Sequence, residues 1–183
     1  MIILHSSQTH DTNALPQKGV ARVLTALKQR FDFIIGDSRA GNEHGVIMAC
    51  LFAEEAGGVM NPEVSSVRDS DRIIGMLSSK TRRAVQNYPP VKEHLLVTRY
   101  SPKRVDTGDM LSVEDVQEIL AIPLVGIIPE SPSVLQASNS GIPVVLEKNS
   151  DAGQAYLDVV ARFLGEEPPS REKKGFLTRL FGN

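Results

Sequence analysis

The chain has 183 residues, of which 41% are hydrophobic and 23% are charged, and its formal net charge at pH 7 is -2. This length and apolar content predict a globular domain and exclude a disordered segment. The charge excludes an overall basic field for gathering nucleic acid, so attraction to an anionic surface requires a local basic cluster.

The first predicted element is a strand, Ile2–Leu4, which begins abruptly after the initiator. We therefore expect a chain truncated at its front. The opening is too short for a signal-peptide core, and no run approaches the ~18 apolar residues of a spanning helix. A helix follows, with Asn13 as its cap, Pro16 in its first turn and apolar residues at helical spacing: Val20, Val23, Leu24 and Leu27.

Strands and helices continue to alternate in the next segment. The apolar, β-branched run 31–35 predicts a buried strand, and residues 45–55 predict a helix. The latter contains Cys50, which has no second cysteine to pair with, so a reducing cytoplasm fits best. Residues 58–60 predict a short strand, and Asn61-Pro62 predicts the cap of a third helix reaching about Arg82.

The second half of the chain repeats the alternation. After a loop over 84–92, residues 94–98 predict a buried strand that runs into a polar loop. Ser112 and Asp115 have capping-box spacing, and the helix that they open has an apolar face of Val113, Val116, Ile119 and Leu120. The remaining predictions are a strand at 123–128, a short helix from Ser131-Pro132, a strand at 142–146 and a helix at 151–164.

This order predicts an α/β fold with a doubly wound, mainly parallel sheet, whose ligands bind at the carboxyl ends of the strands. We expect one domain over residues 1–165 and a linker at 166–171, where two prolines disfavour a helix. Residues 172–183 predict an amphipathic membrane-targeting helix. Its apolar side carries Phe176, Leu177, Leu180 and Phe181, and its basic side carries Lys173, Lys174 and Arg179.

An aspartate at the end of an apolar strand is the first candidate for chemistry. Asp37 follows the run 33–36, which is the Walker B pattern, and its carboxylate is placed to hold Mg²⁺ beside a nucleotide. The same pattern is also typical of an aspartate that only caps a turn or helix. Residues 38–41 and the segment Asn61-Pro-Glu-Val-Ser-Ser-Val-Arg-Asp-Ser-Asp-Arg72 favour the functional interpretation.

The segment 61–72 closely resembles the signature of the MinD family, the septum site-determining ATPases within the deviant Walker A group of P-loop proteins. Segments 92–100, 108–115, 125–130 and 136–140 and the terminal Lys173-Lys-Gly-Phe-Leu177 agree in the same order. The resemblance implies a P-loop NTPase fold that binds ATP and Mg²⁺. It also implies a homodimer, MinC-like and MinE-like partners and attachment to the anionic inner face of the cell membrane from the cytoplasm.

Individual roles also follow from the resemblance. Asp37 matches the Walker B aspartate that serves the metal, and Gly41 matches a residue near the γ-phosphate, while Glu43 matches a position near the dimer face. Arg99 and Pro129 lie in loops that match the adenine rim. The helix carrying Arg68, Asp69 and Asp71 matches the surface that binds MinC and MinE; without the resemblance it is an ordinary solvated helix.

The sequence departs from the family at the phosphate site. It contains no loop of the form Lys-Gly-Gly-x-Gly-Lys-Thr, whose backbone N–H groups and lysines cradle phosphates. The nearest imitation, Gly75 to Thr81, lies in a helical pattern and is predicted to be a decoy. Arg39, Asn42 and His44 also replace residues of the family loop, and His44 has no accompanying nucleophile or ligand pair.

These observations predict a MinD-like protein in division-site selection with little or no ATPase activity of its own. A non-catalytic adaptor or competitor, acting through residues 61–72 and the tail, is the alternative. A DNA-partitioning ATPase of the ParA type shares the fold, but should carry a basic DNA-contacting face instead of an amphipathic tail. We therefore expect no nucleic-acid partner.

Overall fold

The computed structural model describes residues 17–37, 46, 49–147 and 149–168. It divides into two compact units, each treated by itself below. The first draws its described residues from Met1–Gly57 and Arg68–Glu93, and the second from Gly58–Val67 and His94–Asn183. No helix in these ranges is both long enough and apolar enough to cross a membrane.

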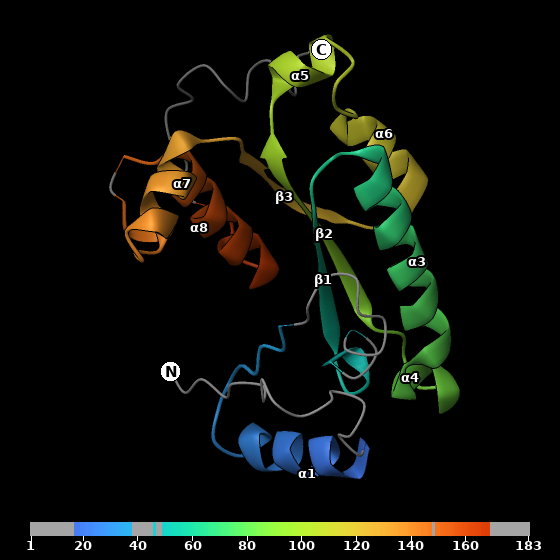
Figure 1. Cartoon of the computed structure of the whole chain (residues 1–183). Coiled ribbons are helices and arrows are strands. Elements are labelled where there is room, and N and C mark those ends of the chain that lie inside the picture. The colour runs from blue at the N-terminus through green and yellow to red at the C-terminus, as the bar shows by residue number, and fades with distance from the viewer. Residues whose placement is uncertain (1–16, 38–45, 47–48, 148, 169–183) are drawn as a thin grey trace. The chain divides into compact units, whose positions relative to one another are not determined.

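Three strands form one sheet in the order β1-β2-β3 (Figure 1). They are β1 (Glu55–Met60), β2 (Lys92–Tyr100) and β3 (Leu124–Pro129). β2 and β3 run parallel, with Leu95 opposite Leu124 and Tyr100 opposite Pro129. The parallel pairing and the connecting helices confirm the predicted α/β class.

The helices of the first unit begin with α1 (Gln17–Lys28), which the apolar spacing predicted. α3 (Val64–Lys80), which belongs to this unit from Arg68 onward, ends two residues before the predicted boundary at Arg82. A separate short helix, α4 (Arg82–Val85), replaces the last predicted turn and the start of the loop at 84–92. Thr81 explains the break because its side chain accepts a hydrogen bond from the Ala84 N–H, which makes it the N-cap of a new helix.

The second unit contains α5 (Pro102–Asp106), α6 (Val113–Leu120), α7 (Pro132–Asn139), the 3₁₀ turn η2 (Val144–Leu146) and α8 (Asp151–Phe163). α6 lies on one side of β2 and β3, and α7 and α8 lie on the other (Figure 1). This two-sided arrangement agrees with the doubly wound prediction. α5 was not predicted, because its five residues begin with a proline and lie within a polar stretch.

The core on the α8 side joins β3 to that helix. Val125 and Ile128 of β3 pack with Ala152 and Val159 of α8, and partly buried side chains surround them: Leu96, Val134, Ala155 and Tyr156. Gly126 allows this close approach, since a Cβ at that position would lie 2.4 Å from Val159 Cγ2. On α6, Val113, Val116 and Leu120 are buried as predicted, whereas Ile119 is exposed.

The predicted capping box is present at the start of α6. The Ser112 hydroxyl accepts a hydrogen bond from the Asp115 N–H at 3.0 Å, and Asp115 Oδ2 accepts one from the Ser112 N–H at 3.1 Å. The α8 helix ends before Gly165, as predicted, where φ is +77°. Glycine tolerates this left-handed conformation without a Cβ clash.

Three local predictions are wrong. Residues 31–37 form no strand, and Phe33 and Ile35 are 65% and 91% exposed, because no described strand pairs with them. The helix expected over 45–55 stops before Leu51, since β1 already begins at Glu55. The strand expected at 142–146 is instead the turn η2, which Pro143 opens. The predicted strand at 2–4 lies outside the described residues.

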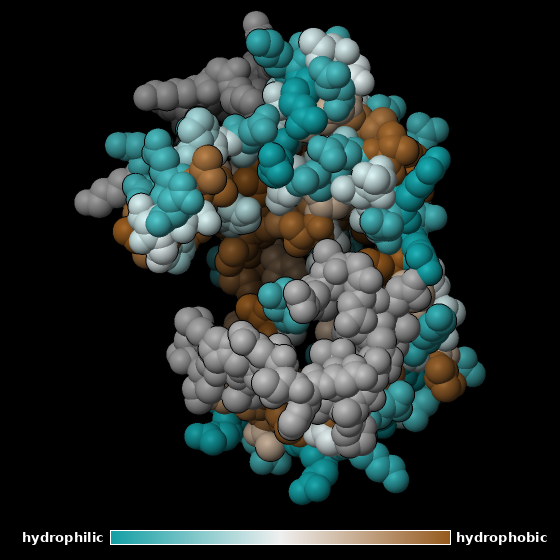
Figure 2. Space-filling model, in the orientation of Figure 1, coloured by the Kyte–Doolittle hydropathy of each residue, from teal (hydrophilic) through white to brown (hydrophobic). Residues whose placement is uncertain are grey.

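Apolar residues remain on the surface of the second unit. Figure 2 shows such residues among polar neighbours over α7 and α8. Those exposed on α7, η2 and α8 include Leu135, Leu146, Leu157 and Val160. Val160 was predicted to belong to the apolar side of its helix, so the buried face of α8 is narrower than the sequence pattern indicated.

Candidate functional site

The carboxyl ends of β2 and β3 meet at one edge of the sheet, which is where parallel sheets place their ligands. Tyr100 lies opposite Pro129, and the Glu130 N–H donates a 2.8 Å hydrogen bond to the Tyr100 carbonyl. Arg99, predicted with Pro129 to line a nucleotide rim, immediately precedes this pair. The structure therefore brings these two predicted residues to the same edge, while their ligand role stays a prediction.

Arg99 has an unusual backbone conformation, with φ of +54°. Such a left-handed φ is uncommon for a residue with a side chain. It coincides with the irregular register between Val97 and Tyr100. Arg99 Nη2 lies 4.0 Å from Glu130 Oε1, and both side chains are largely exposed, so this ion pair contributes little stability.

The end of β1 is joined to the same edge through Thr98. The Thr98 hydroxyl lies 3.2 Å from the Met60 carbonyl and 3.0 Å from Asn61 Oδ1, and it donates its proton to one of them at a time.

Tyr100, the last residue of β2, is buried, and burial raises the pKa of its hydroxyl, with smaller contributions from Glu114 and Asp106. Its hydroxyl therefore stays protonated at neutral pH.

Asp37 lies at the end of the exposed, irregular segment 31–37 of the first unit, whereas Arg99 and Pro129 belong to the second unit. Gly41 and Glu43, predicted near the phosphate and the dimer face, lie outside the described residues, as does His44. Within the described ranges, no three side chains of His, Cys, Asp or Glu gather as metal ligands. The metal role of Asp37 stays a prediction.

The α3 helix presents the predicted partner surface. Arg68, Asp69 and Asp71 are all exposed, while Val67, Met76 and Leu77 of the same helix are buried. Glu63, just before the helix, forms an ion pair with Arg104 of α5 at 3.6 Å within the second unit. The charged edge is therefore accessible on a helix held by its apolar side.

The remaining predictions concern two further segments. Gly75 to Lys80 lie within α3, and Thr81 is the buried cap of α4, so the predicted helical conformation of this segment is confirmed. The predicted membrane residues lie outside the described part of the chain: Lys173, Lys174, Phe176, Leu177, Leu180 and Phe181. Residues 166–168, the described part of the predicted linker, have no regular secondary structure.

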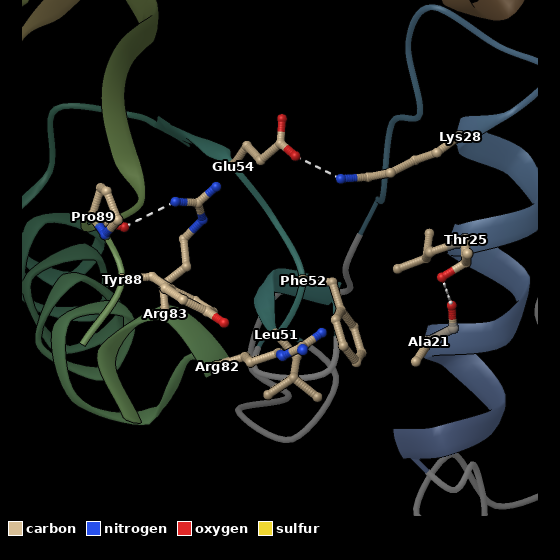
Figure 3. Close-up of a pocket in the computed structure, with 11 residues that line it drawn as sticks. Ala21, Thr25, Lys28, Leu51, Phe52, Glu54, Arg82, Arg83, Tyr88 and Pro89 are labelled. Atoms are coloured by element: carbon tan, nitrogen blue, oxygen red, sulfur yellow. Dashed lines mark hydrogen bonds and ion pairs between the residues drawn. The ribbon is translucent and has the colours of Figure 1, made fainter. Parts of the chain in front are cut away.

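The sequence did not predict a pocket of about 390 Å³ in the first unit (Figure 3). Lys28 of α1 and Arg82 and Arg83 of α4 line it together with Glu54. Lys28, Glu54 and the Arg82-Arg83 pair are far apart in sequence and belong to no shared motif, so no pattern in the chain could have revealed the pocket.

Comparison with known proteins adds relatives over the whole chain. The chain is 62% identical over 187 aligned residues to the septum site-determining protein MinD of Escherichia coli K12, covering 100% of this chain and 69% of that protein. It is 56% identical to the MinD protein of Neisseria meningitidis serogroup B, again covering 100% and 69%. No protein-family model matches the chain.

Solved structures agree in fold. The MinC:MinD cell division complex of Aquifex aeolicus contains a chain 36% identical, with a TM-score of 0.74, covering 87% of this chain and 63% of that one. The MinD protein of Pyrococcus horikoshii, solved with Mg-ADP, is 27% identical with a TM-score of 0.64, covering 81% and 56%. The present chain therefore spans less than two thirds of these solved chains.

Proposed function

The chain belongs to the MinD family of septum site-determining proteins, and we propose that it helps select the division site by recruiting a MinC-like partner through α3. The observation that carries this proposal is the exposed edge of α3 at Arg68, Asp69 and Asp71. A relative in complex with MinC supports the choice of partner. A MinE-like protein is proposed to compete for the same edge.

The charges of α3 set what a partner must offer. Asp69 and Asp71 would attract basic groups of the partner, and Arg68 would attract an acidic group. The complementary surface of the partner should therefore carry both signs of charge. Because the three side chains are exposed, their attraction is screened by salt. We therefore expect association that slows as ionic strength rises.

Membrane attachment is the second part of the proposal. Residues 172–183 would insert their four large apolar side chains at the acyl boundary and face anionic headgroups with Lys173 and Lys174. The protein would then work in the cytoplasm and peripherally on the inner face of the cell membrane, as a homodimer. This part is supported by the sequence pattern and the family resemblance.

The third part of the proposal concerns nucleotide, and it is limited to binding without hydrolysis. The relative solved with Mg-ADP supports binding of a nucleotide with Mg²⁺. The residues proposed for it, Asp37, Gly41, Arg99 and Pro129, come from the family resemblance alone. The described residues fit it only in part, because they offer a strand-end rim but no cluster of metal ligands. These 183 residues also contain no glycine-rich phosphate loop, so we assign no hydrolytic step to them. A non-catalytic adaptor is therefore the alternative form of the same function.

The test is binding of purified MinC-like and MinE-like proteins to an Asp69→Asn/Asp71→Asn double variant. We expect affinity to fall about tenfold, and the loss to shrink at high salt. A matched control removes two exposed carboxylates elsewhere, Glu118→Gln/Glu167→Gln, and should bind like the wild type. Unchanged affinity in the α3 variant would refute the proposed surface. Nucleotide binding measured beside it distinguishes an ATP-dependent protein from an adaptor.

A further inference from the structure

The unpredicted pocket of the first unit lies between α1 and α4, with residues 51–54 and 88–89 completing its wall (Figure 3). Its volume of about 390 Å³ is in the range of small-molecule sites. Phe52 and Tyr88 supply aromatic surface, and Leu24 and Leu51 supply aliphatic surface. The pocket therefore has room and apolar contact for a small organic body.

Its charges do not cancel. Lys28 Nζ and Glu54 Oε1 form an ion pair at 2.5 Å, and the pKa of Glu54 is lowered chiefly by this hydrogen bond. Glu54 is the only carboxylate among the lining residues that the structure describes; Lys28 pairs with it directly, and Arg83 attracts it more weakly, so the three cations of the pocket face one anion. Arg82 and Arg83 therefore leave an excess of two positive charges.

The guanidinium groups of Arg82 and Arg83 are each held by one hydrogen bond within the protein. Arg83 Nη1 donates to the Pro89 carbonyl at 3.0 Å, and Arg82 Nε donates to Gln86 Oε1 at 2.9 Å. The Arg82 guanidinium carbon also lies 5.6 Å from the centre of the Phe52 ring. In the described part of the chain these bonds use one nitrogen of each group. The remaining N–H groups are therefore available to an oxyanion.

We propose that this pocket binds a small phosphate monoester with an aromatic or aliphatic body. A phosphate monoester carries about two negative charges at neutral pH, which matches the two arginines. Arginine is also the residue best suited to bind phosphate oxygens through paired N–H groups. The apolar wall would hold the organic part, and the Lys28–Glu54 pair would close one side without competing for the anion.

Phenyl phosphate is a suitable probe, with phenyl sulfate as its matched control because sulfate has nearly the same shape and one charge fewer. Calorimetric titration of the wild-type chain at pH 7.5 should give phenyl phosphate about tenfold higher affinity than phenyl sulfate. Equal affinity for the two probes, or no binding of phenyl phosphate, would overturn the proposal. This comparison requires no variant, so it does not depend on a mutant folding.

A substitution then locates the site. Arg83→Gln should weaken phenyl phosphate about tenfold, since it removes one charge and one donor fork. Lys80→Gln also removes one exposed cation of the same unit, but it lies outside the pocket and should leave affinity unchanged. Equal losses in both variants would show nonspecific charge attraction and contradict the proposal. The proposed partner edge of α3, Arg68, Asp69 and Asp71, includes neither Arg83 nor Lys80, so the two proposals fail separately.

Discussion

Replacing Gly153 by alanine has two opposite effects on the free energy of unfolding, because alanine favours the helix but its Cβ meets neighbouring atoms. Gly153 is the third residue of α8, where alanine should stabilise the helix by about 0.5–1 kcal/mol. A Cβ there would lie 2.5 Å from the Val144 carbonyl oxygen and 3.2 Å from its carbon. These are backbone atoms of η2 and cannot rotate away, so overpacking should cost about 1–3 kcal/mol. We expect packing to win, with a net loss of about 1–2 kcal/mol.

The matched control is Gly75→Ala within α3. A Cβ at Gly75 meets no atom within 4 Å, so only the propensity gain remains and the protein should become more stable. Urea unfolding followed by circular dichroism measures both variants. With a urea m value of about 2 kcal/mol/M, Gly153→Ala should lower the midpoint by about 0.5–1 M. A Gly153→Ala variant as stable as Gly75→Ala would refute the contact between α8 and η2.

Three further predictions concern the cap, the tail and catalysis. Ser112→Ala should destabilise α6 by about 1 kcal/mol in urea unfolding. Hydrogen bonds from the Ser112 hydroxyl and N–H lower the Asp115 pKa, so their contribution is full above the unfolded value near 3.9 and is lost as pH falls through the folded value. The cap bond from the Asp115 N–H to the Ser112 hydroxyl oxygen does not titrate, so the Ser112→Ala deficit should shrink at low pH without vanishing; a deficit that does not change with pH would contradict this. A peptide of residues 170–183 should bind anionic liposomes more tightly than its Phe176→Glu/Leu180→Glu form, and equal binding would refute the tail assignment. The purified 183-residue chain should release phosphate from ATP no faster than its Asp37→Ala variant, with or without liposomes, because positioning and charge stabilisation need a phosphate cradle; a clear excess would show that phosphate binds elsewhere.

The spacing of apolar residues predicted the strands that are buried on both faces, and the capping-box spacing predicted the helix α6. β3 is almost entirely apolar and β2 contains the apolar run Leu95–Val97, while the Ser112–Asp115 spacing is sufficient to locate the start of α6. The errors arise where an apolar run lacks a described partner. Residues 31–35 have strand composition, but a strand exists only when another strand accepts its hydrogen bonds. Residues 142–146 include the β-branched Ile142, Val144 and Val145, yet Pro143 and the packing of η2 on α8 favour a 3₁₀ turn.

The candidate site was predictable in a similarly uneven way. The family resemblance identified Arg99 and Pro129, and parallel pairing explains why they reach one edge. The left-handed φ of Arg99 could not be predicted, because it lies at an irregular register between two strands that no sequence pattern indicates. The pocket at Lys28, Arg82 and Arg83 depends on tertiary packing alone, so no sequence motif indicated it.

The order of strands in the sheet also bears on how the chain folds during synthesis. Because the spatial order β1-β2-β3 repeats the order along the chain, each strand pairs with the strand made before it. Among the strands that the structure describes, none has to be inserted between two earlier ones. A growing chain can therefore add this sheet one strand at a time as it leaves the ribosome, with each loop closed across a single connection. If synthesis pauses after β3, the three strands should accordingly already be paired, and the apolar residues of α8 should pack against the sheet once that helix has been made.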